Sequence, residues 1–221
     1  MIVAVTGMVR EARILGSAHG KTLIAGSDGA GLVQKLDAAL GRDAAGIISF
    51  GIAGGLMPDI RPGSVVTATK IIAQDGTYPV DEAWAAHIAR AVTGTKQGPL
   101  FGSDVLAATP VEKAALFERT GALAVDMESH IAARVAARHG LPFAALRVVS
   151  DPPGRRLPHA ATVALRPNGK ISLLRVLLSV LGAPWQIPSL IAAGHDSRLA
   201  FSALLRCHRL LGRGLAFPDL G

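Results

Sequence analysis

The sequence predicts an α/β fold, with helices packed on a mainly parallel sheet, and three observations lead to it. Short apolar, β-branched runs alternate along the chain with segments whose apolar residues recur at helical spacing. Half of the 221 residues are hydrophobic, which is enough for a substantial core. Polar residues follow the carboxyl ends of several predicted strands. We expect one domain over residues 1–221.

The N-terminal part is expected to alternate strands with a helix. Apolar runs predict the strands, and leucines at helical spacing predict the helix. The segment Gly51–Gly55 follows the third run and is interpreted as a loop whose backbone can approach a ligand closely. In chain order the predicted elements are strands at 1–6, 22–26, 46–50 and 64–73, with a helix at 32–40.

The alternation continues and then gives way to a helical tail. Thr109 before Pro110 is a favourable N-cap, with proline at the first helical position. The predicted elements are a helix within 74–98, a strand at 99–102, helices from 110 and at 129–139, a strand at 143–149, and tail helices at 171–182 and 196–212. The single domain therefore divides into a core, residues 1–155, and a basic helical C-terminal extension, residues 156–221.

Charge also separates these parts. Of the net charge of +7, residues 1–150 carry +1 and residues 151–221 carry +6. The lone Cys207 excludes an internal disulfide. The seven histidines show no metal-ligand spacing, so neither a metal nor another cofactor is expected. The start of the chain lacks the features of a signal peptide, which predicts a cytoplasmic location.

Several functional classes lose support. No P-loop, no Gly-x-Gly-x-x-Gly after the first strand and no Gly-x-Ser-x-Gly elbow occurs in the sequence, which disfavours nucleoside triphosphate hydrolysis and serine-hydrolase chemistry. The tail has few aromatic residues for stacking on bases and no recognisable motif, so we do not expect nucleic acid as a partner. Acid/base or electrostatic chemistry by carboxylates remains.

Carboxylates after predicted strands are the candidates for that chemistry. Ligands of such sheets bind beyond the carboxyl ends of the strands, where Glu11, Ser103-Asp104 and Asp151 would converge. Asp151 could instead cap a helix, but the following Pro152-Pro153 makes a regular helix start awkward. Glu128 could instead have only a structural role, because a negative charge near the start of an Ala-rich helix interacts favourably with the helix dipole. Glu11 could be an exposed first-turn residue.

Five blocks occur in the order found in one family: Thr6-Gly7 with Glu11, Phe50–Leu56, Gly102–Asp104, Val125–Ser129 and Val149–Asp151. Together they resemble the nucleoside phosphorylase and nucleosidase superfamily, which includes purine nucleoside phosphorylases and methylthioadenosine/S-adenosylhomocysteine nucleosidases. The resemblance covers roughly residues 1–155. It implies a single-domain phosphorylase/hydrolase-like fold with a mixed central sheet flanked by helices.

The tail adds a narrower resemblance. Residues 157–205, with Gln186-Ile187-Pro188 and Gly194–Arg198, look like the phosphorylase-like proteins of hopanoid biosynthesis. That likeness implies adenosylhopane as the substrate and release of adenine. A lipid-linked nucleoside and a basic tail also imply peripheral contact with the inner face of a membrane. The wider superfamily implies a homo-oligomer in which a neighbouring subunit can complete the pocket.

The resemblance also implies roles for particular residues. Asp151 would give a proton to the purine N7, and Glu128 would accept hydrogen bonds from the ribose hydroxyls. Met127 would form an apolar wall beneath the ribose, and Glu11 would activate water in a nucleosidase. Further substrate contacts would come from Gly51, Ile52, Ser103, Asp104 and Ser150, and phosphate contacts from Arg10, Arg13 and Gly7.

The nucleophile is left open between two readings. Phosphorolysis, with inorganic phosphate as co-substrate, is the leading expectation, and hydrolysis on the same site is the alternative. Ile52 stands where many members have Ser or Thr, and Ser49 stands where hexameric phosphorylases carry a phosphate-binding arginine. A non-catalytic nucleoside-binding or membrane-associated scaffold is a third reading.

Overall fold

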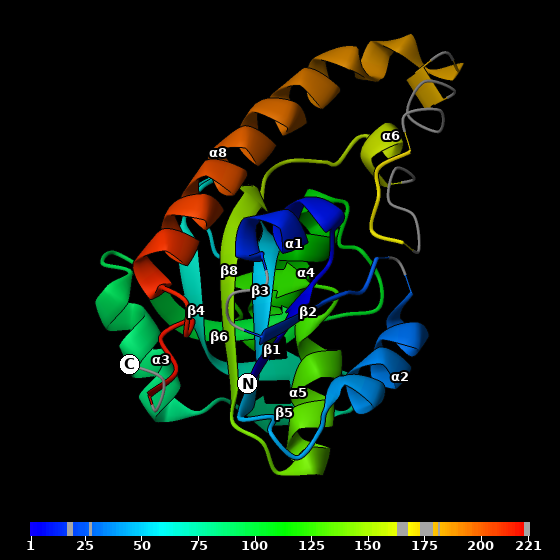
Figure 1. Cartoon of the computed structure of the whole chain (residues 1–221). Coiled ribbons are helices and arrows are strands. Elements are labelled where there is room, and N and C mark those ends of the chain that lie inside the picture. Colours follow the sequence, from blue (N-terminus) through cyan, green and yellow to red (C-terminus); the bar gives the residue numbers. More distant parts are fainter. Residues whose placement is uncertain (17–19, 27, 163–167, 173–178, 181, 219–221) are drawn as a thin grey trace.

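The computed structural model describes residues 1–16, 20–26, 28–162, 168–172, 179–180 and 182–218. Strands and helices alternate along it, and a long helix forms the C-terminal part (Figure 1). The strands are β1 (Ile2–Thr6), β2 (Gly20–Ile24), β3 (Gly46–Gly55), β4 (Val65–Ala73), β5 (Gly76–Pro79), β6 (Lys96–Gly102), β7 (Ala124–Asp126) and β8 (Phe143–Asp151). The helices are α1 (Val9–Leu15), α2 (Gly29–Ala39), α3 (Glu82–Ala91), α4 (Pro110–Thr120), α5 (Ser129–His139), α6 (His159–Thr162), η1 (Pro184–Gln186) and α8 (Ile187–Leu211).

The strands form one mixed sheet, part of which closes on itself. Its path runs β2-β1-β3-β7-β6-β4-β5, and β8 pairs with both β3 and β4. The β8 pairing with β3 is parallel and that with β4 is antiparallel. Strands β3, β7, β6, β4 and β8 therefore complete a ring, while β2 and β1 extend the sheet from β3. The predicted α/β fold with a mixed sheet between helices is confirmed.

The two faces of the sheet bury different helices. Alternate strand residues such as Val3, Ile47 and Val149 pack with α2 and α5. The intervening residues, such as Ala4 and Phe50, pack with α1, α3 and the C-terminal half of α8. The segment after α8 is fixed as well, because the indole Nε1 of Trp84 donates a 2.8 Å hydrogen bond to the Leu215 carbonyl.

Two sequence predictions need correction. Gly51–Gly55 is the second half of β3 and not a loop, because β8 and β7 supply hydrogen-bond partners for its backbone. The last helix begins at Ile187, earlier than the predicted residue 196. The predicted helix at 171–182 lies largely outside the described residues. Within the part of the chain that the structure describes, no helix is both long and apolar enough to cross a bilayer.

Candidate active site

The candidate site lies along the second half of β3, where the carboxyl ends of β1, β7 and β8 meet, β7 running antiparallel to β3. Gly7 follows β1, Met127 and Glu128 follow β7, and Asp151 ends β8. Helix α1 begins directly after β1 and carries Glu11 in its first turn, facing the core. The fold thus brings the three predicted catalytic carboxyls, Glu11, Glu128 and Asp151, to the region around the second half of β3.

A buried guanidinium, that of Arg147, pairs with Glu128 and with the neighbouring Asp126. Arg147 of β8 is fully buried, and its Nη2 donates to Asp126 Oδ1 at 3.0 Å and Glu128 Oε2 at 3.1 Å. The same nitrogen lies 2.6 Å from Ser49 Oγ and 3.2 Å from Ser129 Oγ. A buried charge is tolerated only when it is paired and hydrogen-bonded in this way. Arg147 therefore fixes the start of α5 against β3 and β8.

Glu11 is held by backbone donors and faces the same arginine. Its Oε1 accepts from the Ile52 amide at 2.8 Å and its Oε2 from the Met8 amide at 2.7 Å. A Cβ on Gly51 would lie 2.5 Å from both Glu11 Oε1 and Arg147 Nη1, so only glycine leaves this space open. Nη1 has no hydrogen-bond partner among the described residues. Burial raises the pKa of Glu11, although Arg147 and the amide donors oppose that rise.

Glu128 lies in the same buried environment, and its pKa is also raised. Burial, together with the negative charges of Asp126 and Glu11, raises the pKa of Glu128 to about 8 against the opposing effect of Arg147. Its Oε1 lies over the Gly7 backbone, where a Cβ would come within 2.6 Å. One guanidinium thus faces three carboxyls, and a proton on Glu128 relieves their repulsion.

Because the pKa of Glu128 is raised, we expect the free energy of unfolding to fall as pH rises. Between about pH 4.5 and 8 the folded protein holds a proton on Glu128 that the unfolded chain has lost. The stabilisation is therefore complete below that window and is lost through it, at no more than about 1.4 kcal/mol per pH unit. Urea unfolding at several pH values measures the slope. The Glu128→Gln variant should show a shallower slope, and an equal slope would contradict this assignment.

Asp151 is held by a second, separate set of contacts. Its Oδ2 forms an ion pair with Lys113 of α4, and Ser150 Oγ lies 2.8 Å from its Oδ1. The Ser150 hydroxyl is also 3.2 Å from the Ala53 carbonyl oxygen. A Cβ on Gly54 would lie 3.3 Å from Asp151 Oδ2, which places this carboxyl against β3.

Strand β3 sets the separation of the two groups of contacts. Glu11 and Arg147 meet at Gly51, and Asp151 lies at Gly54. Three residues of extended strand span roughly 10 Å. The two groups of contacts are therefore separate sites along one strand, about that far apart.

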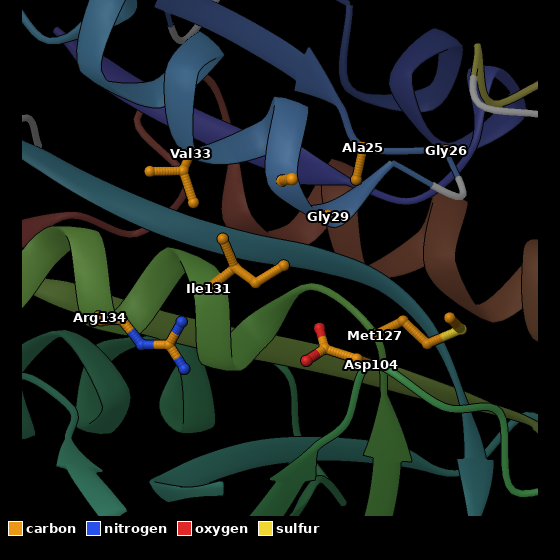
Figure 2. A pocket seen from close by; sticks show the side chains of 9 residues that line it. Ala25, Gly26, Gly29, Val33, Asp104, Met127, Ile131 and Arg134 are labelled. Carbon is orange, nitrogen blue, oxygen red and sulfur yellow. The ribbon is translucent and has the colours of Figure 1, made fainter. Parts of the chain in front are cut away.

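A cavity of about 440 Å³ opens beside Met127 (Figure 2). Asp104, Ile131 and Arg134 lie on one side of it, across from the N-terminal end of α2. Asp104 Oδ1 accepts a hydrogen bond of 3.0 Å from His130 Nε2. The full lining is Ala25, Gly26, Gly29, Ala30, Val33, Asp104, Met127, Ile131 and Arg134. Met127 and Asp104, both predicted substrate contacts, thus share one hollow.

The remaining predicted residues have varied surroundings. Ser103 is buried and bonds within its own turn, since its Oγ donates to the Val105 carbonyl at 2.8 Å. Arg10 and Arg13 are exposed on α1. The Arg10 guanidinium lies 3.9 Å from the centre of the Phe201 ring of α8. Phosphate binding by Arg10, Arg13 and Gly7 stays a prediction.

Sequence reasoning missed two buried cations. Arg147 interrupts an otherwise apolar strand, and a charge in a buried strand requires a partner, so this signal was available. Lys113 lies in a largely polar helix, where nothing in the sequence separates it from an exposed lysine. Asp126 was assigned no contact, yet its Oδ1 accepts from the Glu128 and Ser129 amides at 2.9 and 2.6 Å.

Comparisons with known proteins identify the family of the chain and several relatives. Residues 3–181 match the family model described as the phosphorylase superfamily. The chain is 35% identical over 129 residues to futalosine hydrolase of Streptomyces coelicolor, a match covering 50% of this chain and 55% of the hydrolase. The chain therefore spans about half the length of that curated relative.

Solved structures share the fold over nearly the whole chain. Native futalosine hydrolase of Helicobacter pylori strain 26695 has a TM-score of 0.66 at 14% identity, covering 97% of this chain and 96% of that one. The 5'-methylthioadenosine/S-adenosylhomocysteine nucleosidase from S. pneumoniae, bound to a transition-state inhibitor, has a TM-score of 0.63 at 17% identity, covering 96% and 99%. At these identities the likeness establishes the fold.

Proposed function

The chain belongs to the phosphorylase superfamily, and from that premise we propose that it hydrolyses the N-glycosidic bond of a purine nucleoside. The products would be the free base and the free sugar. Water would be the nucleophile, and no cofactor would take part. The names of the relatives support hydrolysis, since both the futalosine hydrolase and the nucleosidase are water-using enzymes.

One electrostatic observation carries the choice of water over phosphate. The buried guanidinium of Arg147 already faces Asp126, Glu128 and Glu11, so the region around it holds no excess positive charge. A dianionic phosphate placed there would be repelled by carboxylates and would lose its hydration. A neutral water molecule meets neither cost.

The same contacts suggest how the reaction proceeds. A water at Gly51 would donate to Glu11 Oε1 and accept from Arg147 Nη1. Glu11, with its raised pKa, would take the proton as the water attacks the anomeric carbon. Glu128 would hold the ribose hydroxyls, and Asp151 would pass a proton to the departing purine. The proton taken from water and the proton given to the purine would thus be handled at opposite ends of the Gly51–Gly54 segment, with the anomeric carbon between them.

Phosphorolysis of adenosylhopane, the leading expectation from the sequence, gains no support from these relatives. Ser49, at the position of a phosphate-binding arginine in hexameric phosphorylases, is occupied by contacts to Arg147 and Ser129. The substrate beyond its purine nucleoside part is therefore left to experiment, with adenosylhopane among the compounds tried.

The experiment compares base release with and without phosphate. The purified protein would be incubated with futalosine, 5'-methylthioadenosine, S-adenosylhomocysteine and adenosylhopane, after removal of phosphate. Chromatography would quantify the free base, and mass spectrometry would identify the sugar product. We expect release from at least one nucleoside at the same rate with or without phosphate, yielding the free sugar. A sugar 1-phosphate formed only with phosphate would overturn hydrolysis, and no release from any compound would overturn the whole proposal.

Membrane contact, a lipid-linked substrate and a homo-oligomer remain predictions. What favours membrane contact is the first half of α8, where no residue from 187 to 195, all of them described, is buried. Trp185 and Ile191 are 78% and 69% exposed there, and Arg198 and Arg206 are exposed further along. Aromatic and aliphatic side chains beside arginines are typical of surfaces that bind anionic interfaces.

A further inference from the structure

Helix α4 reaches the interior through a lysine. Within α4, all of which the structure describes, Lys113 is the one buried residue, and none of its side chain is exposed. Leu116 and Phe117 of this helix are only partly buried against the core, and Val111 is 77% exposed. Burying an ammonium group is costly unless every N–H finds an acceptor. The burial of Lys113 despite this cost therefore suggests a specific role for its ammonium group.

All three donors of the ammonium are directed at the end of β8. Nζ forms the ion pair with Asp151 Oδ2, and it lies 3.0 Å from the Pro152 carbonyl oxygen and 3.4 Å from that of Arg155. No other charged side chain is paired with Lys113 among the described residues. Lys113 therefore fixes both the Asp151 carboxylate and the chain that follows it.

Because Asp151 is paired with Lys113, the reaction needs a source for the proton that Asp151 gives to the departing base. A carboxylate whose oxygen is paired with an ammonium is ionised, and an ionised Asp151 has no proton to give to a departing base. Arg147, the other buried cation of the site, cannot supply one, because a guanidinium does not deprotonate in proteins. The ammonium of Lys113 is in direct contact with the carboxylate and can lose a proton.

We propose that Lys113 is the positioning residue of Asp151 and the source of the proton that Asp151 passes to the leaving base. As the glycosidic bond breaks, Lys113 passes a proton to Asp151, and Asp151 passes a proton on to the purine nitrogen. The bonding electron pair leaves with the base, and the water proton goes to Glu11. After product release Glu11 loses its proton to solvent and Lys113 regains one, so the balance closes. This inference rests on the proposed hydrolytic function.

Two leaving groups separate this role from a purely structural one. A purine departs readily only when protonated, whereas the 4-nitrophenolate of a 4-nitrophenyl riboside departs as a stable anion. The Lys113→Arg variant keeps the positive charge beside Asp151 but cannot release a proton. We expect its kcat on the purine nucleoside to fall by about 100-fold or more. Its kcat on the nitrophenyl riboside should stay within about threefold, with KM little changed on both.

Controls make the outcomes distinct. Arg119→Met changes an exposed cation on the same helix and should leave both activities intact. If Lys113→Arg does not fold, Lys113→Met, whose side chain has a similar length and no charge, replaces it. This variant should also lose kcat on the purine nucleoside and keep it on the nitrophenyl riboside. An unchanged purine kcat in the folded Lys113 variant, or equal losses on both substrates, would overturn the proton role. A wild-type protein inactive on every nucleoside would instead overturn the proposed function.

Discussion

The Glu11→Gln variant is expected to remain folded and to lose about 100- to 10,000-fold in kcat on a purine nucleoside. The amide has nearly the same size as the carboxyl but cannot accept a proton from water. It also turns an N–H₂ group toward either the Met8 or the Ile52 amide, both of which donate to Glu11. Two facing donors should reduce the free energy of unfolding by about 1–3 kcal/mol. Steady-state kinetics and urea unfolding measure the two effects separately.

Glu118→Gln supplies the matched control for this substitution. Glu118 is exposed on α4, so the same chemical change there should affect neither kcat nor stability. A folded Glu11→Gln protein with kcat close to that of the wild type would remove Glu11 from the role of general base.

The Arg147→Met variant is expected to lose about 3–5 kcal/mol in free energy of unfolding, together with all measurable activity. The substitution leaves Asp126 and Glu128 buried without their cation and removes one of the two hydrogen-bond donors to Ser49. Methionine fills most of the volume, so the loss reports the unpaired charges and not a cavity. Urea unfolding of both proteins at one pH gives the difference.

Arg138→Met tests the same change on the surface. The Arg138–Asp37 pair is about half exposed at both side chains, and pairs of that kind contribute about 0–1 kcal/mol. A loss at Arg147 no greater than that at Arg138 would show that the buried cluster is not held by its guanidinium.

The sequence predicted the alternation of elements well because their signals are local. Helix α4 begins at Pro110 with Thr109 as its N-cap, as predicted, and the Glu112 side chain completes a capping box. Glu11 and Asp151 came together because β1 and β8 both lie parallel to β3 and end beside it, whereas Glu128 reaches them from β7, which runs antiparallel to β3. The contribution of β3 beyond Phe50 was missed, because glycines carry no strand propensity and only pairing with β7 and β8 extends the strand.

The site was predicted less completely, for a physical reason. Glu11, Glu128 and Asp151 could be recognised as acids, but their protonation depends on which cations lie beside them. Arg147 comes from β8 and Lys113 from α4, which are far from Glu11 in sequence. Such partners follow from strand order and helix packing, which residue spacing does not report. The sequence therefore predicted the acids without the residues that control their charge.

The closure of the strand ring has a consequence for synthesis of the protein. Among the described residues, β8 is the last strand in sequence, yet it pairs between β3 and β4, which are made long before it. Until residues 143–151 have left the ribosome, β3 and β4 each present an unpaired apolar edge, of the kind that promotes association between chains. Those same residues carry Arg147 and Asp151. Protection against aggregation and assembly of the site thus depend on one late event.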